Sequence, residues 1–470
     1  MRYFAFLWVA VLHLVLGVVY LLWRVLEGMG DPAWWAWLVW FAEVFLWGLT
    51  LAWMLSRWVA PQHSLGTGFP TPNDAPDFPN IDVWLFRRWD SWLAIEQTLN
   101  TLQAMSYPQD HLRVRVVDLE DAPEIRQQVI ARGGLYTICE GTRDPWQCAL
   151  AETPETTAFI VMLDPGHLPD QQFLPGSLTI FQRSPQVAYG QALLRSLGQT
   201  QTDHPLQTIY IRACDTSGMV PLLGTGCMVR RQALLDLGSL DSRQPVKMGY
   251  RLHGRGWLSF ALPSQVTGAL LPLRNRRHAL LAVLNALKPD PHGLVHMTLP
   301  QRYHYVWLGL WSMSGWATLT YLLVPILYLG WGIAPVPTLG LPFWPWFVPY
   351  IATGRLAWSV AFWGSLDQAW QAERQTGSQF FQSLRATWQW LRGHVAYRER
   401  PSQWSVWPQV VMVLLTLTAI IGGCLRFAHN WDIGWGSLIF ALLWSVYNLA
   451  ILTARPPELI GWMPSRTPED

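Results

Sequence analysis

Charge is what this sequence has least of. Charged residues make up 14% of the 470 positions, whereas a soluble domain usually carries about a quarter. Lysine is almost absent, since Lys247 and Lys288 are the only two, and arginine carries nearly all of the positive charge. The net charge of +2 gives no general attraction for an acidic partner, and nucleic acid is not expected as a ligand. The shortage of charge predicts membrane-spanning segments instead.

Cysteine is also scarce, and it follows no metal-binding spacing. The chain has five cysteines, at Cys139, Cys148, Cys214, Cys227 and Cys424. The odd count and the lack of close pairs predict neither a disulfide framework nor a zinc site. A reducing compartment fits this pattern, because stable disulfides are rare there.

Apolar residues and tryptophan are abundant, at 51% and 31 residues respectively. A spanning helix needs about 20 mostly apolar residues, and tryptophan favours membrane interfaces. The predicted spans are residues 3–24, 33–56, 310–331, 342–363, 406–426 and 434–454. Six spans would place both ends of the chain on one side of the membrane. The first stretch lacks a cleavage site, so it is interpreted as a retained helix and not a signal peptide.

Arginine distribution predicts the orientation. Residues 364–405 carry five arginines, whereas the loop 332–341 has no charge. By the positive-inside rule, this loop, the soluble block and both termini are expected in the cytoplasm. The membrane is expected to be the plasma (inner) membrane or another internal membrane.

The predicted organisation has a soluble block between membrane segments. Short apolar runs alternate with helical stretches in the block, which predicts a mostly parallel sheet with helices on both faces. The expected strands are Val83–Phe86, Val114–Asp118, Phe159–Leu163 and Val187–Gly190. The expected domains are a transmembrane hairpin (1–56), a linker (57–80), an α/β domain (81–272), interface helices (273–309), a transmembrane pair (310–363), an amphipathic interface segment (364–405), a second transmembrane pair (406–455) and a polar tail (456–470).

Five motifs in this frame carry a family resemblance. They are "TLNTLQAMSYPQDHLRVRVVD" (98–118), "LDPGHLPDQQFL" (163–174), "GTGCMVRRQAL" (224–234), "MGYRLHGRGW" (248–257) and "LPQRYHYVWLGLW" (299–311). With the order of spans, they resemble the cellulose-synthase-like membrane glycosyltransferases of family 2. The resemblance covers roughly residues 10–450 and implies a GT-A-like α/β domain inserted in a polytopic helical membrane domain.

The resemblance implies where a nucleotide-sugar donor would bind. The family's acidic position after the first strand falls on Asp90, and its Asp-Asp-Gly falls on Asp118, Leu119 and Glu120. Asp90, Asp118 and Glu120 are therefore the candidate nucleotide-binding residues. The family's lysine-containing donor segment has no counterpart in residues 136–150, which contain no lysine.

The catalytic positions are the most altered. A sugar diphosphate needs a cation such as Mg²⁺ or Mn²⁺, bound by carboxylates. The metal motif keeps Asp164 but has Gly166 where its second ligand belongs. The base position falls on Pro245, which has no ionisable group to take a proton. The family's Gln-x-x-Arg-Trp falls on residues 274–278, where Arg277 matches and His278 replaces the tryptophan.

The membrane segments contain two polar residues of interest. A charged residue inside a span is costly and marks a functional candidate. Glu43 lies in the second predicted span and His13 in the first. Because the two spans form a hairpin, one interpretation is that Glu43 pairs with His13. The alternative is that Glu43 is a protonated or hydrogen-bonded packing residue.

Three hypotheses follow. The leading one is a catalytically impaired glycosyltransferase homologue that acts as a non-catalytic partner or regulator of a membrane complex or of polysaccharide or glycolipid synthesis. Its partners would be the lipid bilayer and an active synthase or another complex subunit, with a UDP-sugar as a possible ligand. The second is an active membrane transferase with a nucleotide-sugar or lipid-linked donor, and only then is Mg²⁺ or Mn²⁺ expected. The third is a solute or lipid translocation scaffold.

Overall fold

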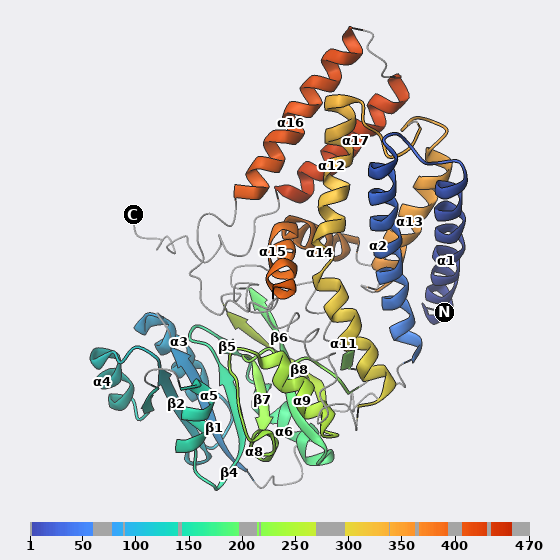
Figure 1. Cartoon of the computed structure of the whole chain (residues 1–470). Coiled ribbons are helices and arrows are strands. Elements are labelled where there is room, and N and C mark those ends of the chain that lie inside the picture. The colour runs from blue at the N-terminus through green and yellow to red at the C-terminus, as the bar shows by residue number, and fades with distance from the viewer. Residues whose placement is uncertain are drawn as a thin grey trace. The chain divides into compact units, whose positions relative to one another are not determined.

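The protein is described by a computed structural model of the whole chain, shown in Figure 1. The residues it describes are 2–59, 78–87, 90–139, 143–196, 214–215, 218–268, 297–337, 339–361, 366–392, 407–429 and 434–453. Two units emerge from the packing of the chain. A helical unit comprises Met1–Trp58 and Trp307–Asp470, and an α/β unit comprises Val59–Val306.

One mixed sheet organises the α/β unit. Its strands are β1 (Asn80–Arg87), β2 (Leu112–Asp118), β3 (Leu135–Ile138), β4 (Thr157–Leu163), β5 (Leu168–Pro169), β6 (Val187–Ser196), β7 (Cys227–Arg230) and β8 (Leu258–Gly268). They lie in the order β3-β2-β1-β4-β7-β6-β8-β5. The first four strands in this order, β3, β2, β1 and β4, are parallel to their neighbours. β7 runs antiparallel to β4 and β6, and β8 is parallel to β6. This mostly parallel sheet confirms the GT-A-like α/β fold, and all four expected strands are present.

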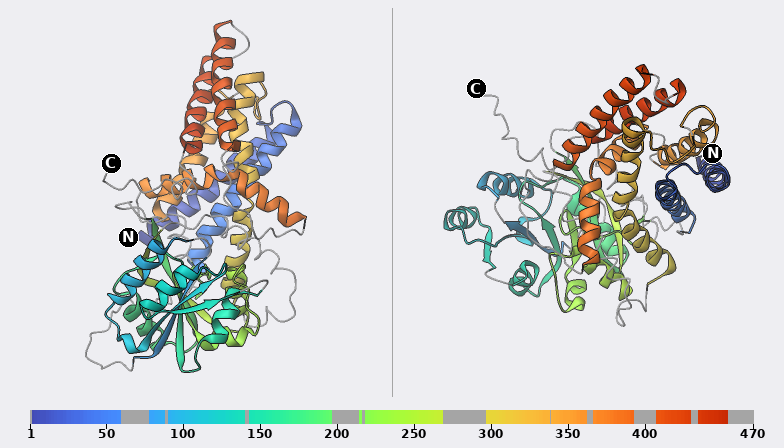
Figure 2. Two further views of the ribbon diagram at one scale, coloured as in Figure 1. Left: turned by 90° about the vertical axis from the view of Figure 1, so that its left-hand side faces the viewer. Right: turned by 45° about the horizontal axis from the view of Figure 1, so that its top comes forward.

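Helices cover both faces of the sheet, as the views in Figure 2 show. They are α3 (Trp92–Gln103), α4 (Pro123–Ala131), α5 (Pro145–Glu152), α6 (Phe173–Arg183), α8 (Arg231–Leu237) and α9 (Pro245–Gly254), with a short 3₁₀ turn at Gln109–His111. Successive side chains of a strand point to opposite faces. Val83 of β1 accordingly lies in the core shared with α3 and α6, and Trp84 lies in the core shared with α5, α8 and α9. Both faces are apolar because both are buried.

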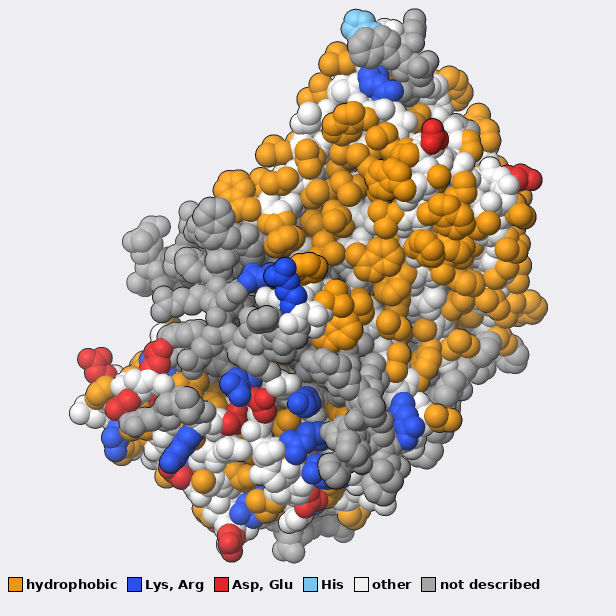
Figure 3. Space-filling view, in the orientation of Figure 1, with side chains coloured by type: hydrophobic (Ala, Val, Ile, Leu, Met, Phe, Trp, Pro, Cys, Tyr) orange, Lys and Arg blue, Asp and Glu red, His pale blue; other side chains and the backbone are white. Residues whose placement is uncertain are grey.

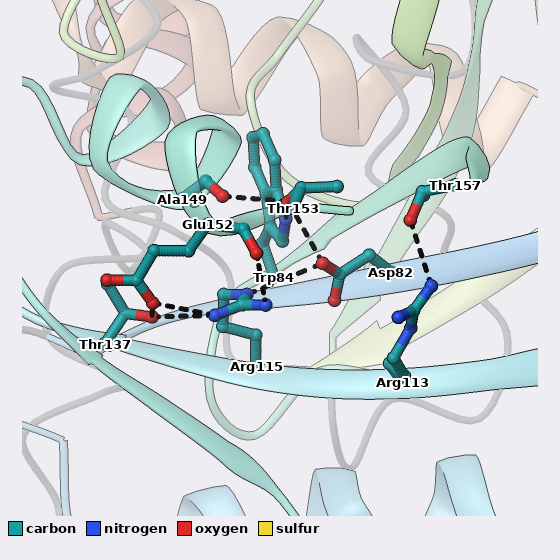
Figure 4. A network of polar contacts seen from close by, with 9 residues as sticks. All are labelled: Asp82, Trp84, Arg113, Arg115, Thr137, Ala149, Glu152, Thr153 and Thr157. Atoms are coloured by element: carbon teal, nitrogen blue, oxygen red, sulfur yellow. Dashed lines mark hydrogen bonds and ion pairs between the residues drawn. The ribbon is translucent and has the colours of Figure 1, made fainter. Parts of the chain in front are cut away.

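A polar network crosses the buried interface between the sheet and α5 (Figure 4). Arg115 of β2 donates to Glu152 Oε2 at 2.9 Å, to Thr137 Oγ1 at 3.0 Å and to Asp82 Oδ2 at 3.5 Å. Thr153 donates to the same Asp82 oxygen at 3.0 Å. Burial raises the pKa of Asp82, and the neighbouring Arg115 charge opposes that rise. These residues lie well before the carboxyl ends of the strands, so the network is structural.

The helical unit contains α1 (Arg2–Leu26), α2 (Ala33–Val59), α12 (Gly315–Trp331), α13 (Trp344–Ala361), α14 (Leu366–Ser378), α15 (Phe380–Leu391), α16 (Trp407–Ala428) and α17 (Trp435–Leu452). α11 (Leu299–Ser312) precedes α12. Among the described residues, five stretches are long and apolar enough to cross a membrane: Phe6–Leu26, Ala33–Leu55, Leu299–Trp331, Trp407–Ala428 and Trp435–Leu452. The expected span at 342–363 forms α13, which packs on α1 but is not among these five.

Apolar side chains cover much of the helical unit in the space-filling view, and charged side chains gather on the α/β unit (Figure 3). The exposed apolar residues of α16 include Leu414, Ile421 and Leu425. Water would solvate these side chains unfavourably, whereas lipid tails would not. The chain is therefore a membrane protein with the bilayer as its surroundings.

Candidate functional site

Asp118 lies at the carboxyl end of β2, and four protein groups donate to its carboxylate. Arg87 Nη1, at the end of β1, lies 2.8 Å from both oxygens. The backbone N–H groups of Glu120 and Ala122 each donate at 3.1 Å. The hydroxyl of Tyr136, on β3, donates to Oδ2. The side chain of Asp118 is fully buried, so the surrounding protein supplies its hydrogen bonds.

The same contacts set the charge of this group. Burial alone would raise the pKa of Asp118, but the hydrogen bonds from Tyr136, the two backbone amides and Arg87 outweigh burial and lower it. Burial, and then the bond to Asp118, raises the pKa of the Tyr136 hydroxyl. Asp118 is therefore an ionised carboxylate at neutral pH, neutralised by an internal arginine.

The other two candidate nucleotide-binding residues lie near Asp118. Asp90 follows β1, and its backbone carbonyl accepts from Arg87 Nε at 3.3 Å. Glu120 lies in the turn after β2, with an exposed side chain. The carboxyl ends of neighbouring parallel strands form the usual ligand edge of such a sheet. The structure therefore brings Asp90, Asp118 and Glu120 together at that edge.

Arg87 and Tyr136 were not predicted as site residues. The register of the sheet contains the signal for Arg87, because Arg87 and Asp118 are directly paired positions on β1 and β2. Side chains at paired positions of parallel strands point to the same face. Tyr136 gives a weaker signal, since a tyrosine on an edge strand usually packs as an apolar residue.

Asp164 ends β4 and begins a tight turn. Its backbone N–H donates to Thr225 Oγ1 at 3.0 Å, and the His167 N–H returns to the Asp164 carbonyl at 3.1 Å. Gly166 has φ +81°, a conformation that favours glycine. His167 is buried, with Nδ1 lying 3.0 Å from Thr225 Oγ1. The frame of the predicted metal motif is thus folded around Thr225.

This turn keeps one of the two carboxylates that the family resemblance implies for a cation. A diphosphate-bound cation is usually held by one or two carboxylates together with the phosphates, so Asp164 is the single candidate ligand at this turn. Across the described part of the chain, no group of three or more His, Cys, Asp or Glu side chains lies close enough to hold a metal ion.

Pro245 occupies the first turn of α9. Proline suits this position because its missing N–H would have no helical partner there. Its ring is buried, and a Cβ added to Gly224 would lie 3.1 Å from Pro245 Cβ. The loop before α9 is tied to α5, since both the N–H and the hydroxyl of Ser242 donate to Asp144 Oδ2 at 2.7 Å. Packing and capping therefore fill the position expected for the catalytic base.

A buried histidine anchors the far end of α9. His253 Nδ1 lies 2.7 Å from the Tyr305 hydroxyl, and Nε2 lies 3.0 Å from Ser259 Oγ. Burial lowers the pKa of His253 to about 3, so the ring is neutral. A neutral ring donates from one nitrogen and accepts at the other, which both contacts allow. His253 thereby joins α9, β8 and α11. The candidate residues Arg277 and His278, with the neighbouring arginines, lie outside the described residues.

The expected pairing of Glu43 with His13 is wrong. The Glu43 carboxylate instead accepts from Tyr20 Oη at 2.6 Å and from Arg24 Nε at 3.1 Å. His13 Nδ1 contacts Thr353 Oγ1 of α13 at 3.1 Å, and its Nε2 has no hydrogen-bond partner. Arg24 lies in the last turn of α1 and its long side chain reaches α2, a partner that spacing within the hairpin did not reveal.

The expectation of no disulfide is also wrong. Cys139, just after β3, is bonded to Cys148 of α5, with a Cα–Cα distance of 5.9 Å. The two positions are nine residues apart in sequence, and the fold returns the chain from the sheet edge to α5 within that distance. Cys214, Cys227 and Cys424 form no disulfide; the first two are buried and Cys424 is exposed.

Comparison with known proteins agrees with the fold and the motifs. No protein-family model matches the chain. Over 194 residues it is 26% identical to the cellulose synthase catalytic subunit (UDP-forming) of Pseudomonas fluorescens (strain SBW25). That stretch is 39% of this chain and 25% of the relative, so the chain matches about a quarter of the relative's length.

Two solved structures are similar to parts of the chain at low identity. The mannosyltransferase PcManGT of Pyrobaculum calidifontis, in complex with GDP-Man and Mn²⁺, is 15% identical with a TM-score of 0.49. The match covers 73% of this chain and 98% of that one. The glucosyl-3-phosphoglycerate synthase of Mycobacterium tuberculosis is 16% identical with a TM-score of 0.33, over 45% of this chain and 81% of that one. No function follows from either likeness.

Sheet order and helix placement define the class: a membrane protein with a GT-A-like α/β fold. Over the matched stretch, the chain is similar to a cellulose synthase catalytic subunit, in line with the resemblance of its motifs.

Proposed function

We propose that this chain is a cellulose-synthase-like membrane protein whose α/β unit does not catalyse metal-dependent transfer from a nucleoside diphosphate sugar. In this proposal it acts as a non-catalytic partner or regulator of a membrane complex that makes a polysaccharide or glycolipid. Its soluble unit would lie in the cytoplasm, beside the active subunit of that complex.

The observation that carries the proposal is Pro245. Transfer to a sugar hydroxyl needs a group that accepts the hydroxyl proton, and loss of such a base typically costs about 10²–10⁴-fold in rate. Pro245 has no such group and is buried against Gly224. A neighbouring carboxylate cannot simply replace it, because Asp144 is already engaged by Ser242 and by the N–H of Trp146.

The ligand edge of the sheet, where Asp90, Asp118 and Glu120 lie, supports the same conclusion. A nucleotide that used Asp118 would have to displace Arg87 or Tyr136 from the carboxylate. Leaving a buried donor without its acceptor costs about 1–3 kcal/mol, and more for a charged group. The donor's binding energy would first have to offset this cost, which works against tight binding at physiological concentrations.

The test is sugar release by the purified full-length protein in detergent, with UDP-glucose and related donors and with Mg²⁺ or Mn²⁺. We expect no release above that of a buffer blank. Pro245→Ala is the matched variant, because it also lacks a base, and it should behave like the wild type. Turnover by the wild type that requires the added cation would overturn the proposal.

Calorimetry with UDP and Mg²⁺ separates two forms of the proposal. Binding without turnover would make the protein a nucleotide sensor, and Asp118→Asn should then weaken the binding at least tenfold. An absence of binding would favour a scaffold that acts through its surface. An active enzyme with a lipid-linked donor remains the second candidate, because Asp164 is only half-buried at the end of β4. In that case Asp164→Ala should abolish product.

A further inference from the structure

The edge strand β3 lies beside Asp118 and, unlike β1 and β2, has a neighbouring strand on one side only. It has four residues and pairs only with β2 in the sheet order. It nevertheless contributes two contacts to Asp118: the Tyr136 hydroxyl donates to the carboxylate, and the Cys139 N–H donates to the Asp118 carbonyl at 2.9 Å. A short strand paired on one side is expected to open easily. Something else must hold it for these contacts to persist.

The Cys139–Cys148 disulfide supplies that support. It ties Cys139, the residue that follows β3, to Cys148 of α5. Cys139 is 3% exposed and packs in the core that contains Trp84 and Trp146. Cys148 is partly exposed. One sulfur is therefore shielded, and the other can be reached from solvent.

We propose that Cys139 and Cys148 form a reversible thiol–disulfide site that fastens β3 and so controls access to Asp118. In the oxidised state the strand end is fixed to α5, and the contacts from Tyr136 and Cys139 to Asp118 are closed. In the reduced state β3 keeps its ladder with β2 and the hydrogen bonds of Thr137, but its end at Cys139 has no covalent tie to α5. Thr137 in the middle of β3 stays bonded to Arg115 and to Glu152 of α5, so the end of the strand next to Cys139 is the part that opens more often. Asp118 then becomes available to an external hydrogen-bond donor.

The chemistry is exchange with a small-molecule thiol such as glutathione. Its thiolate attacks the accessible sulfur of Cys148, which forms a mixed disulfide and releases Cys139 as a thiolate that takes up a proton. A second thiolate attacks the mixed disulfide and releases Cys148. Two external thiols are oxidised to one external disulfide, and the protein disulfide is reduced to two thiols. The reverse exchange restores the bond.

A reversible bond, and not a permanent one, fits the predicted setting. In a cytoplasmic thiol pool, disulfides that form are usually transient and regulatory. The effect also extends beyond β3, because α5 carries Asp144, which binds the Ser242 loop before α9. We therefore expect oxidation to affect both the contacts of Asp118 and the loop before Pro245.

This inference does not depend on whether the chain transfers sugar, and its test does not measure turnover. The full-length protein in detergent is equilibrated with reduced or with oxidised glutathione, alkylated and digested. We expect Cys139 and Cys148 to be protected from alkylation in the oxidised sample and alkylated in the reduced one, with full return on reoxidation. Thiols that stay free after oxidation, or a bond that resists reduction in the folded protein, would overturn the inference.

Hydrogen exchange then tests the consequence. Reduction should speed amide exchange in the peptide that covers β3 at least tenfold, and leave the peptide that covers α6 unchanged. The Cys139→Ser, Cys148→Ser double variant should show the fast rate in either buffer. Cys214→Ser, at a buried cysteine outside the disulfide, should still show the redox-dependent difference. Equal exchange in oxidised and reduced wild type would refute the control of β3 by this bond.

Discussion

Replacing Glu43 by alanine should destabilise the helical unit strongly. Glu43 forms an ion pair with Arg24, in which the Arg24 side chain is 0% exposed and the Glu43 side chain 3% exposed. Glu43→Ala removes the acceptor of both Arg24 Nε and the Tyr20 hydroxyl. Arg24 cannot leave easily, because its other nitrogens donate to the carbonyls of Gly28, Pro335 and Ala36. The variant therefore keeps a buried positive charge and removes the negative charge paired with it.

The expected size follows from that asymmetry. Removing one partner of a buried ion pair costs about 3–5 kcal/mol, because the remaining charge is uncompensated. Hydrogen bonds within membrane domains can be worth only about 0.6 kcal/mol each, so the charge and not the hydrogen-bond count should dominate. Glu43→Gln should cost less than Glu43→Ala, because the amide oxygen still accepts one bond. The double variant Arg24→Met, Glu43→Leu should lie within about 1–2 kcal/mol of the wild type.

The assay is denaturant unfolding of the purified protein in mild detergent, followed by tryptophan fluorescence. A double-mutant cycle compares the wild type, Arg24→Met, Glu43→Leu and the double variant, and Glu43→Ala and Glu43→Gln are measured beside it. Glu27→Ala is the control, since Glu27 is an exposed carboxylate in the same hairpin, and a change below about 0.5 kcal/mol is expected. The reasoning fails if Glu43→Ala unfolds within 1 kcal/mol of the wild type. It also fails if the double variant is as unstable as the sum of the single variants.

Three further predictions concern packing and pH. Arg115→Met should destabilise the α/β unit by about 3–5 kcal/mol, because it leaves Asp82 buried without its cation. Chemical unfolding measures this change, and a loss of stability below about 1 kcal/mol would contradict the prediction. His253, with a pKa lowered to about 3 by burial, stays neutral in the fold while the unfolded chain takes up a proton below pH 6.5. Stability should fall by about 2–3 kcal/mol between pH 7 and 4.5, and His253→Gln should flatten that part of the pH profile; an unchanged profile would refute the assignment. Gly315→Ala should lower the melting temperature, because a Cβ there would lie 2.5 Å from a backbone oxygen of α15, whereas Gly330→Ala in the same helix meets nothing within 4 Å and should be neutral or stabilising.

The sequence predicted the strands better than the contacts between them. The four expected strands are long or strongly apolar, and β1 is buried almost throughout. β3, β5 and β7 escaped prediction because they have four, two and four residues, too few for a period to show. β8 was also missed, although it has eleven residues. The spans were predictable because hydrocarbon thickness fixes their length. α13 is the weakest of them, with a proline inside the helix and a charged residue near its end.

The sequence did not reveal the contacts that surround the predicted catalytic positions. The loss of the base at Pro245 stays a prediction from the resemblance. Arg87 is recognisable only once the register places it opposite Asp118. The disulfide needed the path of the chain from β3 to α5, which nine residues of separation do not define. The partner of Glu43 was mistaken because hairpin spacing ignores how far an arginine side chain reaches.

The hydrogen bonds of Asp118 help to distinguish a site that has lost nucleotide binding from one that is ready to bind a nucleotide. A site that binds charged ligands usually holds groups whose hydrogen bonds are completed only by the ligand, at some cost to stability. Here Asp118 has its donors from within the chain, and Asp144 caps α5 while holding the Ser242 loop. In the proposed function, the contacts of Asp118 stabilise the fold and compete with a nucleotide for its carboxylate. Arg87→Ala separates these two roles. If the site has lost nucleotide binding, the variant should lower stability and still bind no UDP, whereas in a site closed only for regulation it should raise the affinity for UDP measured by calorimetry.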